Sequence, residues 1–295
     1  MKHLIFYTLT IIILQSCNGN DDKADAYGNF EAVETLISAE SSGKILQFDI
    51  EKGMQIKAGQ QVGLIDTAIL SAKIKQLQAV KAEISANSKD VLSQIKVLDE
   101  QKNVLLIEKR RIENMIADSA ATQKQYDDII GKIKVINRQI ESVKVKNSAI
   151  LSKYNQINAQ IEELQINLNK CKIINPISGT VLEKYAEKYE IALPGKVLYK
   201  IADLSTMELK VYVSGAQLPH IKIGQKAKVY IDKNKDENTE MEGTVSWISS
   251  TAEFTPKIIQ TKEERVKLVY AVKLLVKNDG SLKIGMPGEV DFHLN

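Results

Sequence analysis

The sequence predicts an elongated α+β protein, in which a long antiparallel coiled-coil hairpin interrupts a small split β domain and a small β-barrel follows. Three observations lead to this prediction. Two apolar heptad runs lie back to back in mid-chain, a glycine-punctuated strand pattern flanks them on both sides, and the last part of the chain alternates apolar and polar residues. With 295 residues and a formal net charge of +3, the chain can hold two or three domains, and nucleic-acid binding gets little support.

The N-terminus has the layout of a bacterial signal peptide. Lys2 precedes an apolar stretch at residues 4–14 that is too short to span a bilayer as a helix. The sequence Leu14-Gln15-Ser16-Cys17 resembles a lipobox. That resemblance implies removal of residues 1–16 and acylation of Cys17, and several acyl chains on one cysteine would anchor the chain stably. The alternative is an ordinary signal peptide with a chance cysteine. Polar, acidic residues follow, so residues 17–29 are predicted to be a flexible tether.

Residues 67–173 are predicted to form a coiled coil, because they contain two proline-free runs of regularly spaced apolar residues. In the first run the repeat is seven residues: Leu70, Leu77, Ile84, Val91, Leu98, Leu105 and Ile112. In the second the spacing alternates between four and three: Ile129, Ile133, Ile136, Ile140, Val143, Asn147, Ile150, Tyr154, Ile157, Ile161, Leu164 and Leu168. Asn147 is the strongly polar member of the second run. It either fixes the register between two helices or is a tolerated polar core position.

The two runs are separated by residues 118–122, where a helix is expected to stop and restart. Thr122 followed by Gln125 fits a capping box, which predicts helices over residues 69–117 and 123–170. Each helix would be about 70 Å long at a rise of 1.5 Å per residue. Arms of equal length joined by a short turn favour an antiparallel hairpin over a continuous rod that dimerises.

The segments on either side of the heptad runs form an internal repeat of short strands. Gly43 and Gly59 are sixteen positions apart, and Gly179 and Gly195 have the same spacing. Each segment has too few strands to bury a core alone. A hairpin would bring the two segments together, so residues 30–66 and 174–203 are expected to complete one split β domain.

Residues 204–295 are predicted to form a small β-barrel. Five segments alternate apolar and polar residues and are interpreted as strands: residues 207–213, 226–231, 242–248, 266–276 and 288–294. A short helix and a turn are expected within residues 215–225. Trp247, the only tryptophan of the chain, is expected in the barrel core because it stands in a predicted strand; a surface that contacts a partner is the alternative.

Taken together, these features resemble the HlyD-like periplasmic adaptors, also called membrane fusion proteins. The resemblance rests on a half-motif at Ser42-Gly43-Lys44-Ile45, a long helical hairpin, and a second half-motif at Asn175-Pro176-Ile177-Ser178-Gly179. It implies that the split domain is biotinyl-lipoyl-like. The family usually has alanine at the position of Asn175, which is a minor departure. Lipoyl carriers place an acceptor lysine at the tip of a tight hairpin, whereas here helices replace that tip, so no lipoylation, biotinylation or other cofactor is expected.

Barrel segments at residues 218–225 and 282–288 are also similar to this family. Residues 252–257, followed by Gln260-Thr261 and Glu264-Arg265, resemble the adaptors that work with ABC-type exporters. The resemblance therefore implies a periplasm-facing lipoprotein of the inner membrane. It would form a ring, six-membered by family analogy, and link an inner-membrane ABC-type exporter to a TolC-like outer-membrane channel.

The resemblance also implies a docking site at the hairpin tip. Family adaptors carry an arginine, a leucine four residues on and a serine seven residues after that. Here the same spacing gives Arg111, Met115 and Thr122. By analogy these residues would contact the periplasmic end of the outer-membrane channel, with the arginine as a rigid fork of donors. The alternative is a solvated arginine, a core methionine and a helix N-cap.

The sequence indicates no catalytic constellation. After removal of the leader, His220 and His293 are the remaining histidines, and no cysteine cluster, phosphate-binding glycine loop or nucleophile elbow accompanies them. Neither an enzyme nor a metal site is expected, and Cys171 is interpreted as a small core residue. Three other functions stay open: an adaptor of a proton-driven (RND-type) pump, a lipoyl or biotinyl carrier, and a structural coiled-coil lipoprotein of the envelope.

Overall fold

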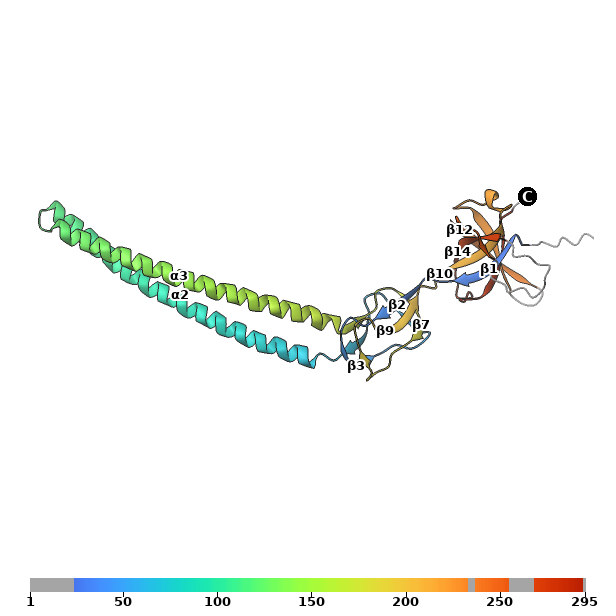
Figure 1. Cartoon of the computed structure of the whole chain (residues 1–295), viewed down its shortest axis with the longest axis horizontal. Coiled ribbons are helices and arrows are strands. Elements are labelled where there is room, and N and C mark those ends of the chain that lie inside the picture. The colour runs from blue at the N-terminus through green and yellow to red at the C-terminus, as the bar shows by residue number, and fades with distance from the viewer. Residues whose placement is uncertain (1–23, 233–236, 255–267, 294–295) are drawn as a thin grey trace, which may run out of the picture.

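The computed structural model describes residues 24–232, 237–254 and 268–293. A helical hairpin, a small β domain and a β-barrel follow one another along the long axis of the molecule (Figure 1). The predicted elongated α+β architecture is confirmed. Cys17 and the predicted leader lie outside the described residues.

The hairpin consists of two antiparallel helices, α2 (Ala68–Ala117) and α3 (Gln123–Lys170), which remain side by side from base to tip (Figure 1). Its most deeply buried side chains are isoleucines spaced for a seam between two helices: Ile74, Ile84, Ile129, Ile133, Ile140 and Ile161. The hairpin, rather than the continuous rod, is the structure that forms. The heptad pattern and the capping box placed both helices to within one residue of their observed ends.

Both segments that flank the hairpin build the β domain at its base. The first contributes β2 (Glu34–Ser38), β3 (Gly43–Phe48), β4 (Gln55–Ile56) and β5 (Gln61–Ile65), and the second contributes β6 (Lys172–Ile174), β7 (Gly179–Lys184), β8 (Ile191–Ala192) and β9 (Val197–Ala202). The two sheets have the orders β2-β9-β7-β4 and β6-β5-β3-β8. Each sheet mixes strands of both segments, so neither segment can complete the domain alone.

The repeated glycines of this domain include two that occupy matching turns. Gly59 and Gly195 have φ values of 78° and 87°, in the left-handed region that favours glycine. Their sixteen-residue offset from Gly43 and Gly179 therefore reflects a duplicated strand–turn unit, as the sequence repeat predicted.

The barrel contains β10 (Thr206–Ser214), η2 (Leu218–His220), β11 (Lys226–Asp232), β12 (Asn238–Ile248), β13 (Glu253–Phe254), β14 (Leu268–Lys277) and β15 (Pro287–Asp291), together with β1 (Ala26–Glu31). Its order is β10-β1-β15-β11-β12-β14-β13, and β10 also pairs with β14. That pairing closes the barrel around a core that includes Phe30, Leu209, Leu274 and Val290.

Strand β1 corrects the predicted tether, which was expected to extend to residue 29. The strand begins at Ala26 and pairs antiparallel with β10 and β15. Phe30 is completely buried in the barrel core. Without β1, the edges of β10 and β15 would be unpaired, so a segment from the start of the chain completes a domain otherwise built at its end.

Trp247 is a second correction, because it is 43% exposed rather than part of the barrel core. The register between β12 and β14 shifts between Val245, which is opposite Leu274, and Trp247, which is opposite Lys273. This irregularity adds a residue to β12 and reverses the alternation of side chains. Val245 therefore faces inward while Trp247 lies on the outer wall.

Candidate functional site

The predicted docking residues lie around the tip of the hairpin, where α2 ends in a tight reversal. Ser119 adopts a positive φ of 59°, its N–H donates to the Ile116 carbonyl (2.9 Å), and the Ala120 N–H donates to the Met115 carbonyl (2.7 Å). These two hydrogen bonds form a Schellman motif, with serine at the position where glycine is usual. The tip is therefore a defined turn and not a loose loop.

Thr122 is the N-cap residue of α3. Its hydroxyl accepts a hydrogen bond from the Gln125 N–H (3.4 Å) and donates one to Gln125 Oε1 (3.0 Å), while the Thr122 N–H donates to the same Oε1 (2.8 Å). The predicted capping box is confirmed. Both hydrogen bonds of the hydroxyl go to Gln125, so Thr122 sets the direction in which α3 leaves the turn.

Arg111 and Met115 lie one helical turn apart near the end of α2, and both reach solvent. The side chain of Arg111 is 74% exposed and its Nη1 lies 3.6 Å from Glu108 Oε2, while Met115 is 38% exposed. An exposed ion pair of this kind contributes little to stability, so the guanidinium is available to another acceptor. The two residues present a planar donor and an adaptable apolar side chain at the distal end of the rod.

A set of contacts that the sequence analysis missed braces the two arms next to these residues. Lys109 Nζ lies 2.9 Å from Glu113 Oε1, and the Tyr126 hydroxyl of α3 donates to the same oxygen (3.3 Å). The ammonium also lies 5.9 Å from the centre of the Tyr126 ring. The hydrogen bond between Lys109 and Glu113 raises the pKa of Lys109 and lowers the pKa of Glu113. The feature of the sequence that could have revealed these contacts is a lysine that recurs at the spacing of the seam residues.

Polar contacts also fix the register of the arms farther from the tip. The Ser88 hydroxyl of α2 donates to Asn147 Oδ1 of α3 (2.8 Å). Nearer the base, Lys81 Nζ donates to Asn158 Oδ1 (2.6 Å) and lies 4.9 Å from the Tyr154 ring centre. Asn147 is therefore partnered across the hairpin, which supports its interpretation as a residue that sets the register.

At the base of the rod, Asn175 joins the two halves of the β domain. It is completely buried, its Nδ2 donates to the carbonyls of Lys57 (3.0 Å) and Ile177, and its Oδ1 accepts from the Tyr199 hydroxyl (3.0 Å). Its backbone N–H and carbonyl pair with Gln60 and Gly59. Burial raises the pKa of Tyr199 to about 12. The departure from alanine at Asn175 is thus a structural clamp rather than a neutral change.

Two side chains near the base of the hairpin have structural roles. Asp66 Oδ1 accepts a hydrogen bond from the Ala68 N–H (2.9 Å), so the strand β5 leads directly into α2 where a lipoyl carrier would have its tight turn. Cys171 is completely buried and its thiol contacts the Ser41 hydroxyl (3.3 Å), as expected for a core residue. Among residues 24–232, 237–254 and 268–293, no group of three or more His, Cys, Asp or Glu side chains could hold a metal ion.

A hollow of about 660 Å³ lies where the β domain meets the barrel and is lined by residues of both, including Lys57, Asp203 and Lys283. The Asp203 carboxylate accepts a hydrogen bond from the Ser205 N–H (2.9 Å), which lowers the pKa of Asp203. The carboxylate that lines the hollow is therefore committed to its own turn.

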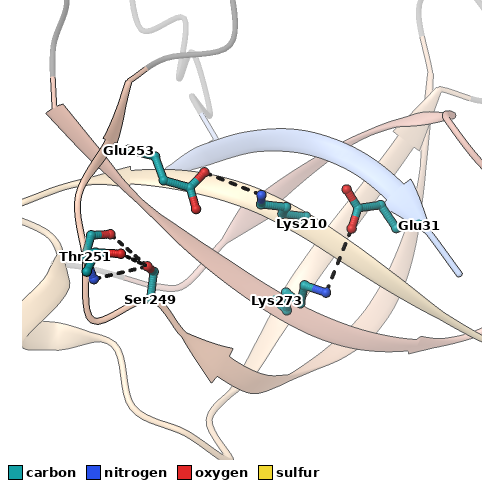
Figure 2. Close-up of polar contacts among 6 residues, drawn as sticks. All are labelled: Glu31, Lys210, Ser249, Thr251, Glu253 and Lys273. Atoms are coloured by element: carbon teal, nitrogen blue, oxygen red, sulfur yellow. Dashed lines mark hydrogen bonds and ion pairs between the residues drawn. The ribbon is translucent and has the colours of Figure 1, made fainter. Parts of the chain in front are cut away.

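The outer wall of the barrel carries a network of charged side chains (Figure 2). Lys210 Nζ lies 3.4 Å from Glu253 Oε2, and Lys273 Nζ lies 2.6 Å from Glu208 Oε2 and 3.9 Å from Glu31 Oε2. Lys210 and Lys273 are direct neighbours on β10 and β14. The three glutamates offset the repulsion between these lysines and tie β1, β10, β13 and β14 together.

Comparisons with known proteins agree with this architecture. The family described as "LcnD-like, C-terminal domain" matches residues 203–291, which contain most of the barrel. A "UPF0194 membrane protein" of Yersinia pseudotuberculosis is 25% identical over 92% of this chain and 90% of its own length. The "UPF0194 membrane protein YbhG" of Salmonella arizonae is also 25% identical, over 92% of this chain and 89% of its own.

Solved structures show the same fold. MacA from Actinobacillus actinomycetemcomitans superposes with a TM-score of 0.62 at 20% identity, over 90% of this chain and 76% of MacA. The membrane fusion protein Spr0693 from Streptococcus pneumoniae gives a TM-score of 0.52 at 16% identity, over 90% of this chain and 96% of its own. Within the part of the chain that the structure covers, neither α2 nor α3 is apolar enough to cross a bilayer.

Proposed function

We propose that this chain, a non-enzymatic HlyD-like periplasmic adaptor in its fold and domain order, connects an inner-membrane exporter to a TolC-like outer-membrane channel. The observation that carries the proposal is the hairpin, a rod of about 75 Å at 1.5 Å per residue, whose base is inserted in a β domain made from both flanking segments. A rod fixed at its base and closed by a defined turn is suited to bridge two membrane-bound partners.

The exporter is proposed to be of the ABC type. This rests on the resemblance of residues 252–265 to adaptors of that subgroup, a segment largely outside the described residues. An adaptor of a proton-driven (RND-type) pump is the alternative. The two differ in the protein that stays bound to the full chain in detergent: an ATPase with a phosphate-binding loop supports the proposal, and a proton-driven pump contradicts it.

Cys17 is proposed to anchor the chain to the inner membrane through acyl chains. Strand β1 begins at Ala26, nine residues after this cysteine, and extended chain spans at most about 3.6 Å per residue, so the barrel would lie within about 32 Å of the lipid. The intact mass of the mature chain tests the anchor. A mass without acyl chains on Cys17 would contradict it, and an adduct on a lysine would instead favour a lipoyl or biotinyl carrier.

The tip residues Arg111, Met115 and Thr122 are proposed to contact the outer-membrane channel. Replacing Arg111 and Met115 with aspartate puts two negative charges on the exposed end of the rod without touching its buried seam. We expect Arg111→Asp/Met115→Asp to abolish export, or the resistance that export confers, while the chain remains folded by circular dichroism.

The matched control is Arg110→Asp/Asn114→Asp, which makes two substitutions with the same spacing one residue earlier on the helix. Both residues are exposed. Unchanged export by the Arg111/Met115 variant, or equal loss in the control, would show that tip docking is wrong. Export that survives complete deletion of the chain would favour a structural envelope lipoprotein.

A further inference from the structure

The apolar seam between α2 and α3 becomes thin toward the tip of the hairpin, the end farthest from the β domain (Figure 1). Ile129 is the buried seam residue nearest the tip. Beyond it, among residues 123–128 of α3, Tyr126 alone is not exposed, and on α2 both Ile112 and Ile116 are only half-buried. Helix ends with so little buried apolar surface open readily, so the seam alone holds the arms weakly where the docking residues lie.

A cluster of polar side chains takes the place of the apolar seam at this height. We name Lys109, Glu113 and Tyr126 the tip clasp. The Lys109 ammonium lies 2.9 Å from Glu113 Oε1 and 5.9 Å from the centre of the Tyr126 ring, and the Tyr126 hydroxyl donates to the same oxygen (3.3 Å). The Lys109 and Glu113 side chains are 29% and 42% exposed, so water screens this ion pair less than the more exposed pair of Arg111 with Glu108.

The tip clasp belongs to a set of polar contacts that recur by whole heptads. Three pairs join the arms: Lys81 with Tyr154, Ser88 with Asn147, and Lys109 with Tyr126. Their members on α2 are separated by 7 and 21 residues, and their members on α3 by the same intervals in the reverse direction. All three pairs therefore belong to one register, which polar seam residues specify in coiled coils. The contact between a lysine and a tyrosine ring occurs twice, once near the base and once near the tip.

The tip clasp and the docking residues lie on different faces of α2. Arg111 follows Lys109 by two residues, and Met115 follows Glu113 by two residues. Two residues correspond to about 200° around a helix with 3.6 residues per turn. The clasp holds its two α2 members toward α3, so the docking residues point away from α3, and both reach solvent. A contact that fixes the rotation of α2 on one face therefore sets the direction of the side chains on the other.

We propose that the three residues of the tip clasp are positioning residues for channel docking. They fix the rotation of the last turns of α2, and in this way they direct Arg111 and Met115 away from α3. The inference rests on the proposed function, in which these two residues are among those that contact the outer-membrane channel. Without the clasp, the last turns of the hairpin open and α2 rotates there, while the seam toward the base stays closed.

Tyr126→Ala removes the clasp member that α3 supplies and keeps a residue that favours the helix. We expect the amides of residues 109–128 to exchange about tenfold faster, because a cation–π contact and a hydrogen bond to a charged group are lost. The full chain, purified in mild detergent, should lose the channel, retain the exporter and unfold at a nearly unchanged temperature. Unchanged exchange, or retention of the channel by a chain whose tip exchanges faster, would overturn the proposal.

The matched control is Tyr154→Ala, which removes the same kind of contact from Lys81, far from the tip. This variant should retain the channel, and the amides of residues 109–128 should exchange at the wild-type rate. An equal loss of the channel in Tyr154→Ala would show that general weakening of the hairpin is responsible, and it would contradict a positioning role for the tip clasp.

A covalent link between the arms separates positioning from direct contact with the channel. Lys109→Cys/Tyr126→Cys removes the clasp, and a short bifunctional thiol reagent then joins the two cysteines, as intact mass confirms. The unlinked chain should lose the channel and the linked chain should regain it, because the link restores the restraint between the arms without the original side chains. A linked chain that recovers no channel would show that these side chains do more than position, and would overturn the proposal.

Lys81→Cys/Tyr154→Cys, treated in the same way, controls for the reagent and for its reaction with Cys17 or with the buried Cys171. This variant should retain the channel before and after linkage. A channel that is recovered only after linkage in this control as well would assign the rescue to stiffening of the whole hairpin and contradict a role specific to the tip clasp.

These measurements separate the tip clasp from the proposed function. Hydrogen exchange follows the tip of the chain by itself and needs neither exporter nor channel. If the wild type retains no channel, the proposed function fails and the role of the clasp in docking fails with it. If both the wild type and Tyr126→Ala retain the channel, the proposed function stands and the positioning role alone is wrong.

Discussion

Asn175 is the residue whose role differs most from its interpretation in the sequence. A single amide touches Lys57 of the first half of the β domain and Tyr199 of the second. In the sequence, Asn175 stands out only as an asparagine where the resembling family usually has alanine. The partners of the amide lie 118 and 24 residues away along the chain, and only the fold brings them together.

Replacing Asn175 with alanine should destabilise the β domain. The variant leaves the buried Tyr199 hydroxyl without its hydrogen-bond partner and removes the hydrogen bond to the Lys57 carbonyl, at a cost of about 1–3 kcal/mol. Urea unfolding of the full chain would measure the loss. Asn175→Ala/Tyr199→Phe should cost less than the sum of the single variants, because it removes both ends of one hydrogen bond; strict additivity would contradict the coupling.

Tyr199 predicts how the β domain responds to high pH. Burial raises its pKa from 10.0 to about 12, so the native state favours the neutral phenol. The stability that this provides is present below pH 10 and is lost as the pH rises toward 12. Tyrosinate absorbance, taken as the difference between the wild type and Tyr199→Phe, should show this one group ionising late. Ionisation near pH 10 in the folded chain would contradict its burial.

At the scale of elements, the hairpin was predictable because its signals are local and repeated. The heptad runs defined both helices, and Thr122 with Gln125 defined the restart. The bracing contacts were missed because they use lysines at seam positions, namely Lys81 and Lys109. In the sequence alone such a lysine is interpreted as a surface residue, and only the structure shows the tyrosine opposite it.

Ser119 offers a test of the turn as an element. A residue other than glycine costs about 1–2 kcal/mol in the left-handed region, and glycine loses about 0.5–1 kcal/mol more chain entropy than alanine. Ser119→Gly should therefore stabilise the tip by about 0.5–1 kcal/mol. Hydrogen exchange of the amides around residues 115–125 would report it as slower local opening. Ser119→Ala is the control and should give no gain, whereas faster exchange in the glycine variant would show that the Schellman geometry is wrong.

At the scale of the whole molecule, the order of domains was predictable and their exact composition was not. The internal glycine repeat and the hairpin together implied that residues far apart share the β domain, and each observed sheet mixes both halves. Strand β1 was missed because its six residues are short and weakly patterned. Its partners, β10 and β15, lie near the other end of the chain, so the pairing is invisible to local rules.

The outer wall of the barrel also depends on pairing between strands that local rules do not predict. Trp247 was expected inside because it stands in a predicted strand, but an irregularity in the pairing of β12 with β14 turns it outward beside Lys273. Such an irregularity depends on two strands at once and leaves no mark in the sequence of either.

The most direct test of the central claim, that the chain joins an exporter to a channel, is purification of the intact full chain from bacterial membranes in mild detergent, with mass spectrometry of what remains bound. The account predicts that an inner-membrane exporter of the ABC type and an outer-membrane channel are recovered together with the wild type, and that the channel alone is lost with Arg111→Asp/Met115→Asp. Recovery of the folded chain with neither protein would contradict the claim.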